Sequence, residues 1–64
     1  MDNEKLFEMF KEVVDKEHEA YETYKDIAEN VDDENLKKIF EDMAKDELKH
    51  KKQIMEQYNI LKNN

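Results

Sequence analysis

Apolar side chains recur every three or four residues along almost the whole chain, and this repeat is interrupted only between Asn30 and Asn35. The spacing lines up apolar groups along one side of a helix and does not match the alternation of a strand. Glycine, proline and cysteine are absent, which disfavours a turn-rich fold and excludes a disulfide framework. The pattern predicts a single all-α domain over residues 1–64, an antiparallel hairpin with helices at about residues 3–30 and 33–61.

Each predicted helix carries one apolar stripe. The first stripe is Leu6, Phe10, Val13, Glu17, Ala20, Tyr24, Ile27 and Val31, and the second is Leu36, Phe40, Met43, Glu47, His50, Ile54, Gln57 and Leu61. Asp32 is the expected N-cap of the second helix, with Val31 and Leu36 at the spacing of a hydrophobic staple around it. Both stripes are wide enough for a helical bundle rather than a two-stranded coiled coil.

Size and charge narrow the classes of protein to which the chain can belong. At 64 residues the chain is too short for a generous core, so a metal or a partner subunit is expected to help stabilise it. A formal net charge of −7 argues against nucleic-acid binding. No apolar run approaches the roughly 20 residues of a membrane span, and no signal-peptide pattern opens the chain. We therefore expect a cytoplasmic protein without nucleic-acid or membrane partners.

Glu17, Glu47 and His50 are ionisable residues at positions where packing alone would place leucine or isoleucine. A buried carboxylate without a partner is costly, so these residues call for a specific counterpart. If the turn centres near Asp32, residues whose numbers add up to about 64 should face each other, and Glu17 and Glu47 meet this condition. Carboxylate and imidazole ligands together suit iron, manganese or zinc. The sequence therefore predicts a metal site halfway along the hairpin.

One hairpin supplies only two carboxylates and one imidazole, and it leaves its wide apolar face in water. Packing two hairpins into a four-helix bundle, with a two-fold axis at mid-height, solves both problems. The homodimer then offers four glutamates and two histidines, the ligand set of carboxylate-bridged di-iron bundles. We expect two iron ions per dimer, with manganese or zinc as alternatives, and leave open a higher oligomer.

The spacing Glu17-x-x-Ala20-x-x-x-Tyr24-x-x-x-Ala28, followed by Ala44-x-x-Glu47-x-x-His50, resembles the ferritin-like and rubrerythrin-like di-iron superfamily. The single-hairpin length is most similar to that of the encapsulated ferritins, which carry half a bundle per chain. This resemblance implies that Glu17, Glu47 and His50 bind iron, with Glu47 bridging the two ions. It also implies that Tyr24 lies near the iron as a further catalytic residue. The implied activity is a ferroxidase-type oxidation of Fe(II) by oxygen or peroxide, in iron storage or oxidative-stress protection.

Two features depart from these relatives. Rubrerythrins proper append a four-cysteine rubredoxin-like domain, whereas this chain has no cysteine. Encapsulated ferritins usually end in a tail rich in glycine and leucine that docks in a protein shell, whereas the last residues here are Ile60-Leu61-Lys62-Asn63-Asn64. We therefore expect no rubrerythrin-type peroxidase activity without an external electron donor, and no docking in an encapsulin shell.

Other interpretations of the pattern remain open. The chain could be a non-catalytic dimer that holds zinc or manganese, or a helical hairpin that docks a protein partner without metal. A designed mini-protein on the di-iron plan is a further alternative, although the irregular mixture of side chains in the stripes favours a natural sequence. His18 and Lys51 are interpreted as solvated residues outside the site.

Overall fold

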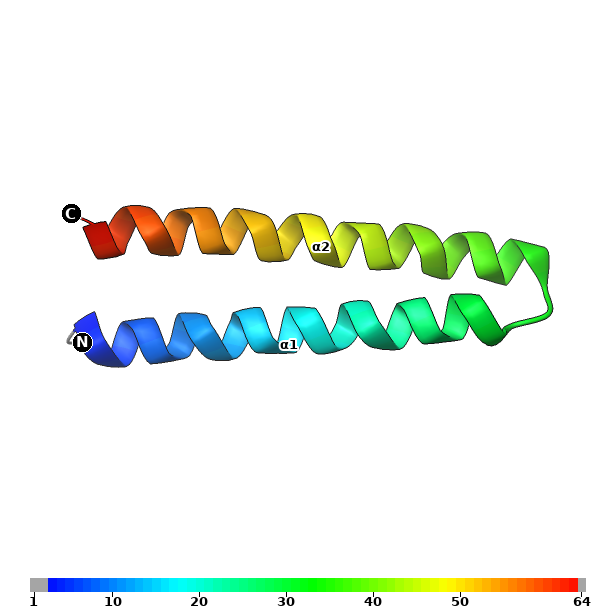
Figure 1. The fold of residues 1–64 in the computed structure, drawn as a ribbon, viewed down its shortest axis with the longest axis horizontal. Helices are drawn as coiled ribbons and strands as arrows, with labels where there is room; N and C mark the ends of the chain where they lie inside the picture. The colour runs from blue at the N-terminus through cyan, green and yellow to red at the C-terminus, as the bar shows by residue number, and fades with distance from the viewer. Residues whose placement is uncertain (1–2, 64) are drawn as a thin grey trace.

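The computed structural model describes residues 3–63 of the chain, which form two helices, α1 (Asn3–Asn30) and α2 (Glu34–Asn63). Figure 1 shows them running antiparallel and side by side, with the beginning of α1 and the end of α2 at the same end of the molecule. The predicted all-α hairpin is confirmed. Helix α1 has the predicted bounds, while α2 begins one residue later and ends two residues later than predicted.

The N-cap of α2 is Asp33, so the prediction of Asp32 is wrong by one residue. The Asp33 Oδ1 atom accepts a hydrogen bond of 2.9 Å from the backbone N–H of Leu36, the bond that an N-cap side chain makes to the third residue of a helix. This shift places Asp32, rather than Val31, directly before the cap, so Val31 and Leu36 do not occupy the staple positions. The two aspartates are adjacent and chemically equivalent, and the geometry of the three-residue link selects the second one.

The hairpin has very little core of its own. Among the described residues only Ala28 and Ala44 are buried, and every larger apolar side chain keeps part of its surface in solvent. The accessible surface is 5376 Å². A compact monomer of this mass would expose about 4,400 Å². The chain therefore exposes roughly 1,000 Å² more than a compact fold, an excess comparable to one partner's share of a standard interface.

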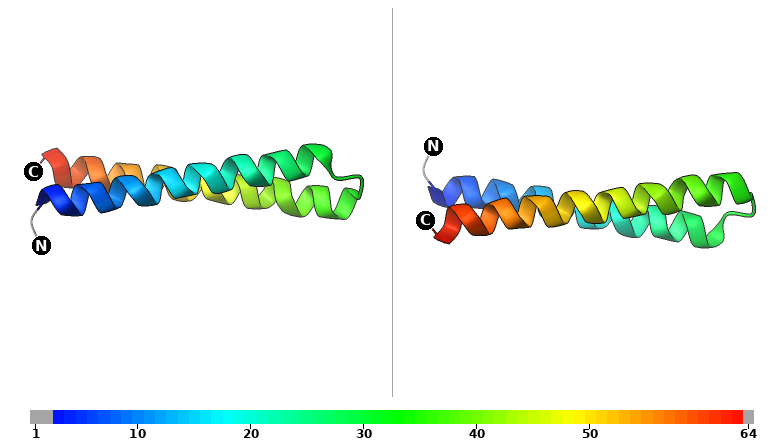
Figure 2. Two further views of the ribbon diagram at one scale, coloured as in Figure 1. Left: turned by 90° about the horizontal axis from the view of Figure 1, so that it is seen from below. Right: turned by 90° about the horizontal axis from the view of Figure 1, so that it is seen from above.

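Aromatic contacts hold the two helices in register. The Tyr24 and Phe40 rings, which the register predicts to face each other, have centroids 6.1 Å apart. At the open end, Tyr58 lies edge-on to Phe7 and Phe10, with centroid distances of 5.2 and 6.3 Å. Figure 2 shows the helices crossing at a shallow angle about halfway along their length. Glu17, Glu47 and His50 lie near this crossing.

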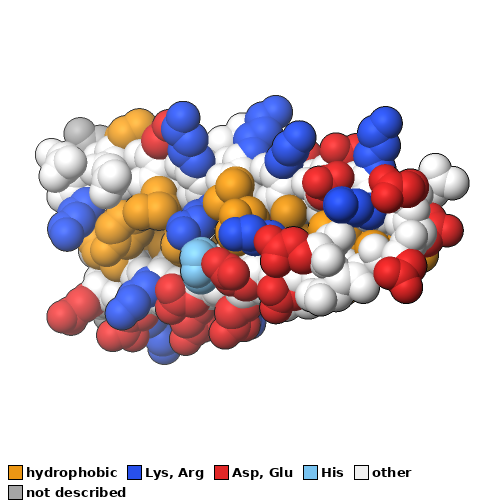
Figure 3. Space-filling view, turned by 45° about the vertical axis from the view of Figure 1, so that its right-hand side comes forward, with side chains coloured by type: hydrophobic (Ala, Val, Ile, Leu, Met, Phe, Trp, Pro, Cys, Tyr) orange, Lys and Arg blue, Asp and Glu red, His pale blue; other side chains and the backbone are white. Residues whose placement is uncertain are grey.

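The molecule is a thin rod of 47 × 16 × 13 Å. In Figure 3 apolar side chains lie in the trough between the helices, and charged side chains stand on both sides of it. Within the described residues, neither helix combines the length and the apolar content that a bilayer-spanning segment needs.

Candidate metal centre

Three ligand-type side chains meet near the middle of the hairpin. Glu17 projects from α1, while Glu47 and His50 project from α2, one helical turn apart on the same side. Each offers one ligand atom, and the three atoms lie within 4.8 Å of one another. The structure therefore brings together the three residues that the sequence singled out as metal ligands. Their role as ligands stays a prediction.

Glu17 holds the most unusual atom of this group. Its side chain is only 25% exposed, and its Oε2 atom is buried without a hydrogen-bond partner. The nearest cationic candidate is the His50 ring, whose Nδ1 lies 3.7 Å from this oxygen, beyond hydrogen-bond length. Leaving a buried carboxylate oxygen without a donor costs free energy of folding, so the site lacks a positively charged or donor group at this point.

The pKa of Glu47 is shifted by its neighbour Glu17. Its pKa is raised from the ordinary value, first by a side-chain hydrogen bond with Glu17, then by burial, then by repulsion from the Glu17 charge, while His50 acts in the opposite direction. The cause is the close approach of two carboxyl groups, which disfavours a second negative charge at this point. A divalent cation placed between them would remove this repulsion.

The geometry suits a transition metal after a small contraction. Two ligands at about 2.1 Å from one ion lie at most about 4.2 Å apart, close to the limit of 4.8 Å within which the three ligand atoms lie. His50 is 55% exposed, so its ring has room to turn toward the carboxylates. Carboxylate and imidazole donors fit Fe(II), Mn(II) or Zn(II), and two glutamates with one histidine leave coordination positions open.

Tyr24, the fourth residue in the predicted site, is not part of this group in the single chain. It is half-buried, and its ring packs on Phe40. Seven residues separate it from Glu17, an axial distance of about 10 Å. A role for its hydroxyl near the iron stays a prediction.

The sequence did not indicate a row of polar contacts that joins Lys51, His18 and Glu22 beside the site. The half-buried Lys51 crosses from α2, and its Nζ donates to the His18 Nδ1 atom at 3.2 Å. Because a lysine can only donate, the other ring nitrogen of a neutral His18 carries the hydrogen and faces Glu22 at 3.6 Å. Both residues occur among polar neighbours, so the helical pattern alone indicated solvated side chains. Only the reach of the long lysine side chain could have suggested the bond.

Comparison with known proteins bears on the whole chain. A family model described as Rubrerythrin matches residues 2–64. No curated protein and no solved structure matches the chain.

Proposed function

This chain belongs to the rubrerythrin family, whose members are ferritin-like di-iron proteins, and we propose that it oxidises Fe(II) with oxygen or peroxide at a site shared by two copies of the chain. The activity would serve iron storage or protection against oxidative stress. Glu17, Glu47 and His50 of each copy are the proposed ligands, and Glu47 is the proposed bridge because it lies beside His50 on α2.

The observation that carries this proposal is the unpartnered Oε2 of Glu17, which faces His50 and lies against the Glu47 carboxyl. A chance pair of surface glutamates would turn apart into water rather than converge. Here the two carboxyl groups converge from different helices. A cation at this point would replace repulsion by attraction and satisfy the orphaned oxygen.

Two copies are needed because three ligands cannot hold two metal ions. We call the side of the hairpin on which His50 is exposed the metal face. Its apolar residues are Val13, Ile27, Leu36, Ile39 and Leu61, all of them exposed. Helical spacing supports this grouping, since Ile39 and Leu61 each lie eleven residues from His50, three turns along the same side of α2. We propose that a second hairpin covers this face and contributes the matching half of the site.

The four carboxylates and two imidazoles of such a dimer would hold two iron ions, which would supply the two electrons that oxygen or peroxide takes up. The protein side of the chemistry is positional. Glu17 and Glu47 would supply the carboxylate ligands, and His50, whose ring lies 3.7 Å from the Glu17 carboxyl group, would supply the imidazole. The apolar side chains of the metal face, once covered by the second copy, exclude bulk water from the site.

Oxygen consumption after anaerobic loading with Fe(II) tests the activity. Wild-type protein should consume oxygen and produce Fe(III) faster than buffer containing the same iron. Glu47→Ala should lose this acceleration, whereas Glu19→Ala, an exposed glutamate elsewhere on the hairpin, should keep it. Metal binding without oxygen consumption would instead favour a structural zinc or manganese site.

A further inference from the structure

The hairpin has a second apolar surface that lies away from the metal ligands. Three hollows of about 480, 550 and 160 Å³ follow one another along it. The first two share Leu48, and the last two share Met55, so they adjoin in one row, which we call the groove, and its middle hollow is lined by α2 residues alone. None of the three is lined by a residue of the proposed metal site. Leu48 lies only two residues from His50, and therefore projects from nearly the opposite side of α2.

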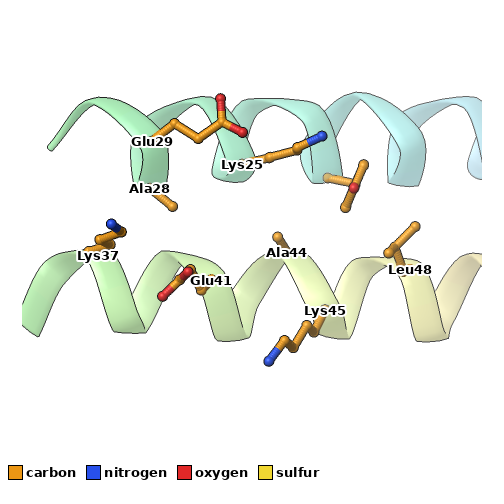
Figure 4. A pocket seen from close by; sticks show the side chains of 9 residues that line it. Lys25, Ala28, Glu29, Lys37, Glu41, Ala44, Lys45 and Leu48 are labelled. Carbon is orange, nitrogen blue, oxygen red and sulfur yellow. The ribbon is translucent and has the colours of Figure 1, made fainter.

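The shape of this groove fits a helix. It runs from Lys37 to Tyr58, a distance of about 30 Å along α2. Figure 4 shows the first hollow, where the small side chains of Ala28 and Ala44 point toward the opposite helix. The exposed Leu48 and Met55 supply the apolar contacts that an incoming helix would bury.

The charges around the groove differ from those of the rest of the chain. Six of the eleven lysines line it, against three of the eighteen acidic residues. These lysines are Lys11, Lys25, Lys37, Lys45, Lys51 and Lys52. The chain as a whole has a net charge of −7. A cationic rim on an acidic protein selects for a partner with acidic side chains beside its apolar ones.

A second copy of the chain does not meet this description. Two grooves facing each other would oppose lysine to lysine. Helix α1 of a second copy has nine acidic residues and four lysines, so its charge could match the lysines of the groove. Its acidic outer side, however, has no apolar stripe that could fill the groove. The apolar stripe of α1 already faces α2 and the metal face.

We propose that this lysine-rimmed groove binds an amphipathic α-helix of another protein, one whose apolar stripe is bordered by aspartate and glutamate. The stripe packs on Leu48 and Met55, and the acidic flanks pair with the lysines. The interaction does not require metal, because the groove and the metal group share no residue.

A synthetic peptide of about 20 residues, with leucines at heptad spacing and glutamates beside them, is the probe. Its counterpart carries lysines in place of the glutamates. Fluorescence anisotropy with purified wild-type protein should show binding of the acidic peptide, weakened by added salt. The basic peptide should bind at least about tenfold more weakly.

Two variants locate the binding. Leu48→Glu should weaken the binding of the acidic peptide by about tenfold or more, because it places a charge where the complex would bury a leucine. Ile60→Glu is the matched control, since Ile60 is similarly exposed and lines none of the three hollows. The double reversal Lys45→Glu with Lys52→Glu should exchange the preference between the two peptides. Circular dichroism checks that each variant is folded.

Four results would overturn the proposal. These are equal binding of both peptides, no binding of the acidic peptide, an unchanged affinity in Leu48→Glu, and binding of phosphatidylserine vesicles without binding of the peptide. An assembly larger than a dimer that dissociates only in Leu48→Glu would identify the occupant as another copy of the chain, and would equally contradict it.

Discussion

The carboxyl groups of Glu17 and Glu47 meet across the hairpin, and hydrogen bonding with Glu17 is the first cause that raises the pKa of Glu47 above its ordinary value of 4.5. Two carboxyl groups from different helices are thereby held against each other at the point where the helices cross.

The metal-free protein should lose stability as the pH rises from 4.5 through the raised pKa of Glu47. A carboxyl group with a raised pKa binds its proton more tightly when the chain is folded, so its stabilising effect is present at low pH and lost above that pKa. Glu47→Gln, which mimics the protonated form, should melt higher than wild type at neutral pH and at the same temperature near pH 4.5. Thermal melts of both proteins between pH 4.5 and neutral pH check this prediction. A difference in melting temperature that stays constant with pH would contradict it.

Fe(II) under anaerobic conditions, or Mn(II), should raise the melting temperature. At about 100 times the dissociation constant, binding adds about 2.7 kcal/mol to the free energy of unfolding. For a chain of this size the corresponding rise in Tm is roughly 10 °C or more. His50→Ala should abolish the rise, while His18→Ala, which removes a histidine outside the group, should retain it. Identical melting curves with and without metal would count against the site.

Ile39→Glu should prevent dimer formation and the binding of a metal pair. Ile39 is 52% exposed and lies on the metal face, so a charge there would be buried in the proposed dimer. Ile60→Glu is the matched control, because Ile60 is 53% exposed but lies outside the metal face. Analytical ultracentrifugation of both variants gives the answer. Dissociation of neither variant, or of both, would mean that the metal face is not the interface.

Tyr24→Phe should retain the wild-type amount of bound metal. The substitution keeps the ring that packs on Phe40 and removes only a hydroxyl about two turns from Glu17. Elemental analysis measures the metal, and stopped-flow absorbance measures Fe(II) oxidation in the same sample. Slower oxidation with full metal content would support the role near the iron that the family resemblance implies. Loss of metal would contradict the placement of Tyr24 outside the ligand group.

The fold could be predicted because one signal dominates it. The apolar repeat defines both helices, and the short link sets their direction and register, which brings Glu17 level with Glu47. The cap residue could not be predicted, because Asp32 and Asp33 offer the same chemistry and only the path of the link separates them. The bond from Lys51 to His18 depends on how a flexible side chain crosses between helices, which periodicity does not encode.

Native mass spectrometry with elemental analysis, on protein loaded anaerobically with Fe(II), decides whether two chains share a di-iron site. We expect a species of two chains that carries two iron ions, and the loss of both ions in Glu47→Ala. A single chain that refuses iron, or a dimer whose iron content is unchanged in Glu47→Ala, would contradict it.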